Sequence, residues 1–276
     1  MNIIIQDNHL QAFAAHLHQA EKSPATCEKY LRDVAQFRKF TQNQPLTKEL
    51  TIAYKQHCIQ KGYAPRSINS MLASVNSFLS FLGLPHYRVK SIRLQRQIYC
   101  PEDRALSKQE YRRLVNAAGG SQICLILKAI CATGIRVSEL RHFTLEAVSA
   151  GQITIQSKGK NRTILIPGKL RKLLLAYAKK CSLSAGPIFL GRKGQPVDRS
   201  CIWKKMKSLC KKAGVTACKV FPHNLRKLFA RTFYEAEKDI AVLADLLGHS
   251  NINTTRIYII TTGYEHRKRI ERLNLL

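Results

Sequence analysis

Apolar residues recur at helical spacing along almost the whole chain, and strict alternation with polar residues occurs at one place. Ile153 and Ile155 alternate with polar neighbours, and Ile164 and Ile166 do the same after a polar loop at 157–162. Such alternation in two short runs is typical of a β-hairpin, whereas repeats of three and four residues indicate helices. The sequence therefore predicts a mainly α protein with one small β-hairpin.

The first part of the chain shows helical spacing only. Four helices are expected between residues 9 and 84, and a proline follows Ser23 and Ala64, where two of these helices begin. Proline suits the first position of a helix because the N–H that it lacks would have no partner there. We expect a compact helical domain over residues 1–88.

The sign of the charge narrows the class of binding partner. The chain of 276 residues holds 46 lysines and arginines against 17 aspartates and glutamates, a net charge of +29. Such an excess favours a polyanion, since each neutralised phosphate releases bound counterions. Charge alone fits DNA and also a protein that coats RNA, so it leaves both partners open.

A change of character separates the first domain from the rest. Residues 86–104 lack a clear period and are rich in arginine and lysine, which suits a linker lying along DNA or a solvated basic loop. We interpret 89–104 as the linker and 105–276 as a second domain, whose start at Ser107 has the spacing of a capping box. Helices are expected in it at residues 108–118, 121–132, 137–144, 168–180, 198–213, 222–235, 238–248, 252–259 and 264–273.

Several sorting and metal-binding signals are missing from the sequence. None of the nine cysteines forms a Cys-x-x-Cys pair, and no apolar secretion signal follows a basic start. There is also no apolar run of about eighteen residues, the length that a membrane-spanning helix needs. We therefore expect a cytoplasmic protein with reduced thiols and no membrane partner.

Four places in the second domain collect residues suited to a phosphodiester, and a helix start among them offers free backbone N–H groups. They are ATGIRVSEL with Arg136, the hairpin tip with Lys158, FPHNLRKLF with His223 and Arg226, and LADLLGHSNINTTRIYI with His249 and Tyr258. Each piece alone is weak, because such residues are usually solvated charges or packing residues. The ordered combination is more informative than any one of its parts.

In this order, the set resembles the tyrosine recombinase family, also called the phage integrase family, over the whole chain. ATGIRVSEL and LLGHSNINTTRIY are close to family signatures, and the chain is similar to the short Xer-type or transposon-borne members. The resemblance implies a helical core-binding domain that contacts DNA and a mixed α/β, mostly helical catalytic domain. It assigns six catalytic positions: Arg136 and Arg226 as the two arginines, Lys158 as the hairpin lysine, His223 as the first histidine, His249 as the second His-or-Trp position, and Tyr258 as the nucleophile.

The resemblance also implies a chemistry. The two arginines would bind the non-bridging phosphate oxygens, and His223 would accept the phenol proton. Lys158 would protonate the leaving 5′ oxygen, and His249 would donate a hydrogen bond to the phosphate. A 3′-phosphotyrosyl link conserves the bond energy, so neither a metal nor a nucleotide cofactor is expected. In agreement, the sequence shows no carboxylate set for two-metal catalysis and no Walker loop.

Three functions are compatible with this pattern. The leading hypothesis is a site-specific recombinase for DNA integration, excision or resolution, with double-stranded DNA as partner and a homotetramer on paired sites. Free protein would be a monomer or weak oligomer, associated with the nucleoid, and the segment 264–276 would dock in a neighbouring protomer or in its own. The alternatives are a type IB topoisomerase, which relaxes supercoils with the same residue set, and an inert DNA-binding protein, against which the intact set argues.

Overall fold

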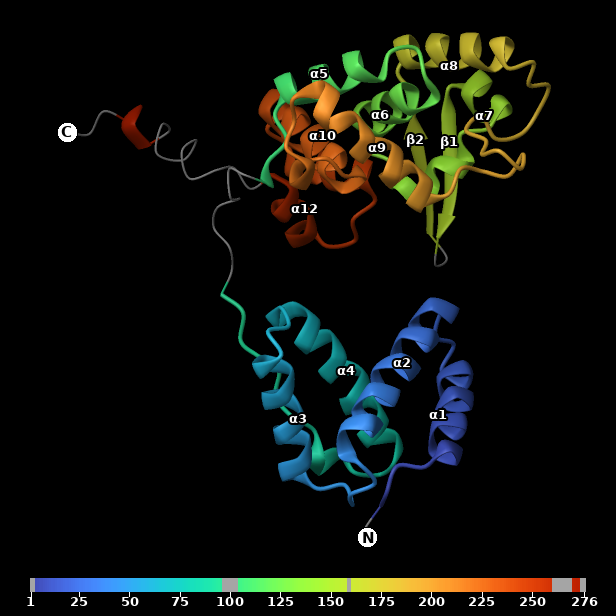
Figure 1. The fold of residues 1–276 in the computed structure, drawn as a ribbon. Helices are drawn as coiled ribbons and strands as arrows, with labels where there is room; N and C mark the ends of the chain where they lie inside the picture. Colours follow the sequence, from blue (N-terminus) through green and yellow to red (C-terminus); the bar gives the residue numbers. More distant parts are fainter. Residues whose placement is uncertain (1–2, 96–103, 158–159, 260–269, 274–276) are drawn as a thin grey trace. The chain divides into compact units, whose positions relative to one another are not determined.

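The computed structural model describes residues 3–95, 104–157, 160–259 and 270–273 (Figure 1). The chain divides into two compact units, residues 1–96 and 97–276. These described residues form a mainly helical fold with one two-stranded antiparallel sheet, as the sequence predicted. Within the described ranges, no helix is both long and apolar enough to cross a membrane.

The first unit is built from helices only in its described part. They are α1 (Asp7–Gln19), α2 (Pro24–Thr41), α3 (Lys48–Gln60), α4 (Pro65–Phe81) and the 3-10 turn η1 (Pro85–Tyr87). Pro24 and Pro65 occupy first helical positions, as expected. The hydroxyl of Thr47 accepts a hydrogen bond from the Leu50 N–H at 3.1 Å and caps α3.

Helix α4 forms the centre of the first unit and packs against α1, α2 and α3. Its buried face carries Leu72 and Phe78, neither of which is exposed to solvent. The Phe78 ring meets Phe13 of α1 edge to face at 5.1 Å, and Phe37 of α2 meets Tyr54 of α3 at 4.9 Å. Such aromatic contacts add to the burial of apolar area.

The residues after η1 are fastened to α4. The Asn76 amide donates to the Val89 carbonyl at 2.9 Å and accepts from the Val89 N–H at 3.0 Å. Asn69 makes the same two contacts with Ile92, at 2.9 and 2.7 Å. The start of the expected linker 89–104 therefore packs against the first unit, and the linker assignment as a whole stays a prediction.

The second unit contains the sheet and the remaining helices. The helices are α5 (Lys108–Ala118), α6 (Gln122–Thr133), η3 (Val137–His142), α7 (Leu145–Ala150), α8 (Gly168–Lys180), α9 (Arg199–Ala213), η4 (Ala217–Lys219), α10 (Pro222–Glu237), α11 (Ile240–Leu247) and α12 (Ile252–Ile259). The capping box expected at Ser107 is present, with Glu110 bonded to the Ser107 N–H at 2.8 Å. The expected helix 264–273 falls mostly outside the described residues.

One helix differs from the sequence-based expectation. Residues 137–144 were expected to form one helix, but they contain the 3-10 helix η3, which ends at His142, and the short helix α7 after Thr144 was not expected. The Thr144 hydroxyl accepts from the Ala147 N–H at 3.2 Å and starts the new helix. Phe143 between them is fully buried, and its non-helical backbone ends η3 there.

The hairpin is longer than expected. Strands β1 (Gln152–Ser157) and β2 (Lys160–Leu165) are antiparallel, and the pairing includes Ile155 opposite Arg162. The polar loop expected at 157–162 is therefore largely strand. Backbone pairing does not require apolar side chains, so the ladder continues past the last isoleucine.

Helix α10 lies among the elements that carry the predicted catalytic residues. It packs against α6, α11 and α12, and Figure 1 shows α12 beside it (orange and red). Pro222 opens α10 at its first position. The helix ends of α6 and α11 both meet this helix, which brings segments more than a hundred residues apart in the sequence to one place.

Candidate active site

Arg226 is the buried anchor of the site. Its side chain on α10 is among the largest that are fully enclosed, with 2% of the residue exposed. The guanidinium donates to the Gly134 carbonyl and, at 2.6 Å, to the Leu247 carbonyl. These carbonyls end α6 and α11, where the helix dipoles are negative and favour a cation. Burial, with the charge of Arg136, lowers the pKa of Arg226 to about 10, which leaves it charged at neutral pH.

Glycines follow both helix ends at positions where a side chain has no room. Gly134 and Gly248 both have φ of +63°, a left-handed conformation that other residues rarely adopt. A Cβ on Gly134 would lie 2.5 Å from the Phe229 ring, and one on Gly248 would lie 2.3 Å from the Cδ of Arg162. A side chain at either position would displace the residues packed around the site.

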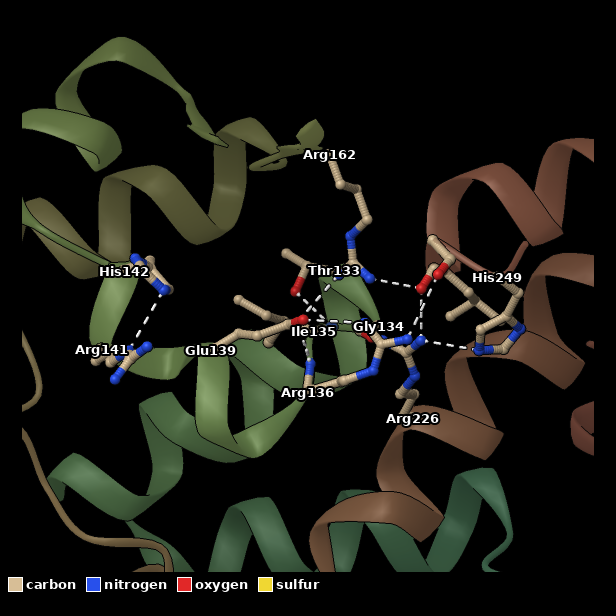
Figure 2. A network of polar contacts seen from close by, with 12 residues as sticks. Thr133, Gly134, Ile135, Arg136, Glu139, Arg141, His142, Arg162, Arg226 and His249 are labelled. Carbon is tan, nitrogen blue, oxygen red and sulfur yellow. Dashed lines mark hydrogen bonds and ion pairs between the residues drawn. The ribbon is translucent and has the colours of Figure 1, made fainter. Parts of the chain in front are cut away.

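Arg136 and Arg162 share the carboxylate of Glu139 (Figure 2). Arg136 Nη1 lies 2.9 Å from Glu139 Oε1, and Arg162 Nη2 lies 3.2 Å from Oε2. Arg162 also donates to the Leu247 carbonyl at 2.5 Å, the acceptor that Arg226 uses. Burial acts to raise the pKa of Glu139, but hydrogen bonds and the charges of the two arginines lower it overall. Glu139 is therefore ionised, and two guanidinium groups, those of Arg136 and Arg162, share its carboxylate.

The three arginines differ in what solvent can reach. The Arg136 side chain is 41% exposed, whereas that of Arg162 is 12% exposed. Arg136 is thus open to an incoming anion, while Arg162 holds the shared Glu139 from the buried side. Positive charges grouped in this way attract an anion to the exposed guanidinium.

Tyr258, in the last turn of α12, packs onto this cluster. The residue is 9% exposed, and its ring meets His223 at 5.0 Å and His249 at 4.9 Å between centroids. The guanidinium of Arg226 lies over the ring at 5.7 Å from its centroid. The aromatic ring therefore contacts a cation and two imidazoles from separate segments of the chain.

The two histidines are held in an environment that disfavours their charged form. His249 Nε2 lies 3.1 Å from Arg226 Nη2, and its Nδ1 lies 2.9 Å from the Thr255 hydroxyl. Burial and the neighbouring arginines lower the pKa of His249 to about 4. Partial desolvation, with the charges of Lys227 and Arg226, also lowers the pKa of His223. Neutral imidazoles can accept a proton, which a charged imidazole cannot do.

The structure brings five of the six predicted catalytic residues together. Through these contacts, Arg136, His223, Arg226, His249 and Tyr258 form one cluster. Lys158, the sixth, lies outside the described residues. In the part of the chain that the structure describes, no three His, Cys, Asp or Glu side chains are grouped so as to hold a metal ion.

Sequence reasoning missed Arg162. It was assigned to the polar loop, yet it lies on the same strand face as the buried Ile164 and Ile166. Continuing the two-residue alternation backwards from these isoleucines places residue 162 on the core side. An arginine at a core-facing strand position needs a buried partner, which here is Glu139.

Family models match both units. Residues 104–263, more than half of the chain, match the model described as the phage integrase family. Residues 10–84 match the model described as the phage integrase N-terminal SAM-like domain.

Curated relatives match along most of the chain. Tyrosine recombinase XerA of Pyrococcus furiosus is 28% identical over 278 residues, which cover 97% of this chain and 94% of that protein. Tyrosine recombinase XerD of Staphylococcus aureus strain N315 is 30% identical over 230 residues, 77% of each chain.

Solved structures show the same fold. The crystal structure of XerA recombinase is 25% identical, with a TM-score of 0.56 over 96% of this chain and 98% of that one. A lambda integrase dimer bound to a COC′ core site is 17% identical, with a TM-score of 0.72 over 91% of this chain and 76% of that one. At this low identity, the likeness to lambda integrase shows a shared fold and nothing more.

Proposed function

Because this chain belongs to the phage integrase family of tyrosine recombinases, we propose that it cuts and rejoins DNA strands at specific sites with Tyr258 as nucleophile. The observation that carries the proposal is the packing of the Tyr258 ring against His223, His249 and Arg226. A phenol is a weak nucleophile at neutral pH and needs a proton acceptor and a positive field. The cluster contains both beside one tyrosine.

Arg136 and Arg226 are proposed to bind the scissile phosphate. Arg136 is accessible, and Arg226 lies beneath the Tyr258 ring with an Nε that has no hydrogen-bond partner among the described residues. Planar guanidinium groups can bind two phosphate oxygens at once and neutralise charge that develops in the pentavalent transition state. Arg162 and Glu139 would fix Arg136 in place.

The histidines are proposed to act on the attacking phenol and on a non-bridging phosphate oxygen. His223, whose pKa is lowered, is neutral near pH 7 and would accept the Tyr258 proton. His249 would donate a hydrogen bond to a non-bridging oxygen. Attack of the phenolate forms the 3′-phosphotyrosyl bond and breaks the bond to the 5′ oxygen, which leaves as a hydroxyl after protonation. A 5′-hydroxyl from a partner strand then reverses the step.

Lys158 is proposed as the acid that protonates the leaving oxygen, on the strength of its motif position. Lys158→Ala should slow cleavage strongly, and a substrate with a 5′-bridging sulfur should restore it, because a thiolate leaves without protonation. Lys160→Ala is the matched control and should mainly weaken DNA binding. Rescue of the Lys160 variant alone would contradict the assignment.

Double-stranded DNA and a homotetramer on paired sites are the proposed partners, with the nucleoid as the cellular location. Solved structures of similar fold include a lambda integrase tetramer bound to a Holliday junction and XerH bound to its difH substrate. Ile270 and Leu273 near the end of this chain are 65% and 62% exposed, which suits docking of segment 264–276 in a neighbouring protomer. Deleting this segment should leave DNA binding intact and abolish stable synapsis.

The nucleophile is tested by trapping covalent adducts. A DNA duplex that the wild-type protein selects from a randomised pool is nicked next to the cleavage point, so that cleavage cannot be reversed. Wild-type protein should form an adduct on denaturing gels, and Tyr258→Phe should bind the duplex yet form none. Tyr234→Phe, at a tyrosine on α10 outside the proposed catalytic residues, is the control and should react like wild type. Supercoil relaxation without recombination between two sites would favour the topoisomerase alternative.

A further inference from the structure

Thr255 is a buried polar residue that the proposed mechanism does not use. It lies on α12, three residues before Tyr258, and is not exposed to solvent. Its hydroxyl oxygen lies 2.9 Å from His249 Nδ1. The neighbouring Thr254 is exposed, so the two adjacent threonines occupy different environments on one helix.

The contact with Arg226 determines where the proton of His249 sits. A guanidinium can only donate hydrogen bonds, and Arg226 Nη2 lies 3.1 Å from His249 Nε2. Nε2 must therefore accept, which places the single proton of the neutral ring on Nδ1. The Nδ1–H then donates to the Thr255 hydroxyl. In this arrangement, Nε2 has no hydrogen to offer a phosphate.

The proposed role of His249 requires the opposite arrangement. To donate to the scissile phosphate, Nε2 must carry the proton, and Nδ1 must then accept a hydrogen bond. A hydroxyl can serve both forms of the ring because it accepts and donates, whereas a carbonyl or carboxylate would hold the proton on Nδ1. A role for Thr255 in this exchange rests on the proposed function and extends the site beyond the six predicted residues.

We propose that Thr255 is a positioning residue that holds the His249 ring through both of its neutral forms and so lets Nε2 change from accepting from Arg226 to donating to the phosphate. The change conserves charge: one proton leaves Nδ1 to water and one arrives from water at Nε2. The Thr255 hydroxyl hydrogen rotates towards Nδ1, and the freed Arg226 Nη2 donates to the phosphate. Thr255 and Tyr258 lie on one face of α12, so the same helix carries the nucleophile and this support.

The first test is a double-mutant cycle on single-turnover cleavage of the selected, nicked duplex. Thr255→Val removes the hydroxyl and nearly keeps the shape, and we expect it to slow cleavage about 10-fold or more with DNA affinity unchanged. The Thr255→Ser protein should cleave at a rate within about 3-fold of wild type, because it keeps the hydroxyl. The Thr254→Val protein should cleave at a rate within about 2-fold of wild type. In a His249→Phe background, Thr255→Val should slow cleavage no further, because a residue acting through His249 loses its effect there.

The outcomes separate this inference from the proposed function. No adduct from wild-type protein would overturn the proposed function and this inference with it. A wild-type adduct together with an unimpaired Thr255→Val protein would overturn the inference alone. Equal slowing by Thr255→Val in the wild-type and His249→Phe backgrounds would make Thr255 a purely structural residue and would likewise overturn it.

The second test measures which nitrogen of the His249 ring carries the proton, and it does not depend on cleavage. In DNA-free protein labelled with ¹⁵N at histidine, the His249 spectrum should show the proton on Nδ1. Adding the selected duplex to the Tyr258→Phe protein should move it to Nε2, and this shift should be lost in the protein that also carries Thr255→Val. A proton on Nε2 in the DNA-free wild-type protein would contradict the inference.

Discussion

The two units treat a buried carboxylate differently. In the first unit, Asp33 pairs with one lysine, whereas in the second unit Glu139 pairs with two arginines. A third arginine, Arg226, binds the same Leu247 carbonyl as one of these two. Asp33 is 5% exposed and pairs with Lys29 at 2.6 Å, and the Ser74 hydroxyl donates to it at 2.9 Å. In the second unit, Glu139 binds Arg136 and Arg162. The first arrangement balances its charges, and the second leaves an excess of positive charge.

The difference distinguishes an ion pair that only stabilises the fold from a cluster that can bind an anion. A buried pair that is complete needs no further ligand, and breaking it mainly removes stability. Arg226 and Arg162 instead donate to neutral carbonyl oxygens at helix ends, which support the cations without cancelling their charge. An anion that binds beside Arg136 would complete the balance. We expect the two regions to respond differently to the same kind of substitution.

The largest expected effect is on cleavage when the innermost cation of the second unit is changed. Arg226→Lys should slow single-turnover cleavage about 10³-fold, because an ammonium group has fewer donors than a guanidinium and cannot present a planar fork to the phosphate. Lys29→Met is the counterpart in the first unit. It should lower the free energy of unfolding and leave the cleavage rate of the folded protein within about 3-fold. Equal cleavage rates for the Arg226→Lys and Lys29→Met proteins would show that the arginine cluster is no more important for cleavage than the ion pair of the first unit.

The next effect concerns how tightly the arginine cluster is packed. Gly248→Ala should lower the free energy of unfolding by about 3 kcal/mol, since the new Cβ meets Arg162 in addition to the backbone strain. Gly214, at the end of α9, has φ of +59°, but a Cβ added there would meet nothing within 4 Å. Gly214→Ala should therefore lower it by only about 1 kcal/mol. Urea denaturation measures the free energy of unfolding of both variants. An equal loss in the two would mean that the Arg162 side chain moves away from the new Cβ at no cost.

Replacing each carboxylate by its amide tests whether the cations that it leaves behind can take up another anion. Glu139→Gln and Asp33→Asn should each lower the free energy of unfolding by roughly 2 kcal/mol. Sulfate should restore about 1 kcal/mol more to the Glu139 variant than to the Asp33 variant, because only the arginine cluster can take up an anion. Thermal denaturation in sulfate and in chloride at equal ionic strength provides the measurement. The same sulfate response in both variants would argue against a site that accepts anions.

The smallest expected effect is on stability at low pH. The folded protein lowers the pKa of His249 to about 4 and lowers that of His223 below its usual 6.5. Groups with a lowered folded pKa favour the folded state above the unfolded pKa, and this stability is lost as pH falls from about 6.5 towards 4. With allowance for partial exposure, we expect a loss of about 1 kcal/mol. The His249→Phe protein should lose less, and an identical pH dependence would show that His249 is not the cause.

Much of this fold could be predicted because its signals are local. Proline at Pro24 and Pro65 and the Ser107 capping box act within one helical turn, so the sequence alone locates those helix starts. The end of η3 at His142 and the helix α7 were not predicted in this way, because Phe143 between them is buried against residues distant in the sequence, such as Phe189.

The candidate site shows the same division. The motif order predicted which residues would gather, including His223 and Arg226 on one helix face. It missed Arg162, whose importance comes from a carboxylate on another segment, and Thr255, whose hydroxyl matters because of the His249 ring beside it. Partnerships between distant side chains leave little trace in a single sequence.

The most direct test of the central claim is to identify the residue that carries the DNA. Wild-type protein is trapped on the nicked duplex, digested with nuclease and protease, and the nucleotide-bearing peptide is sequenced by mass spectrometry. We expect the phosphoryl group on Tyr258. A phosphoryl group on Tyr264, or on any other residue, would contradict the account.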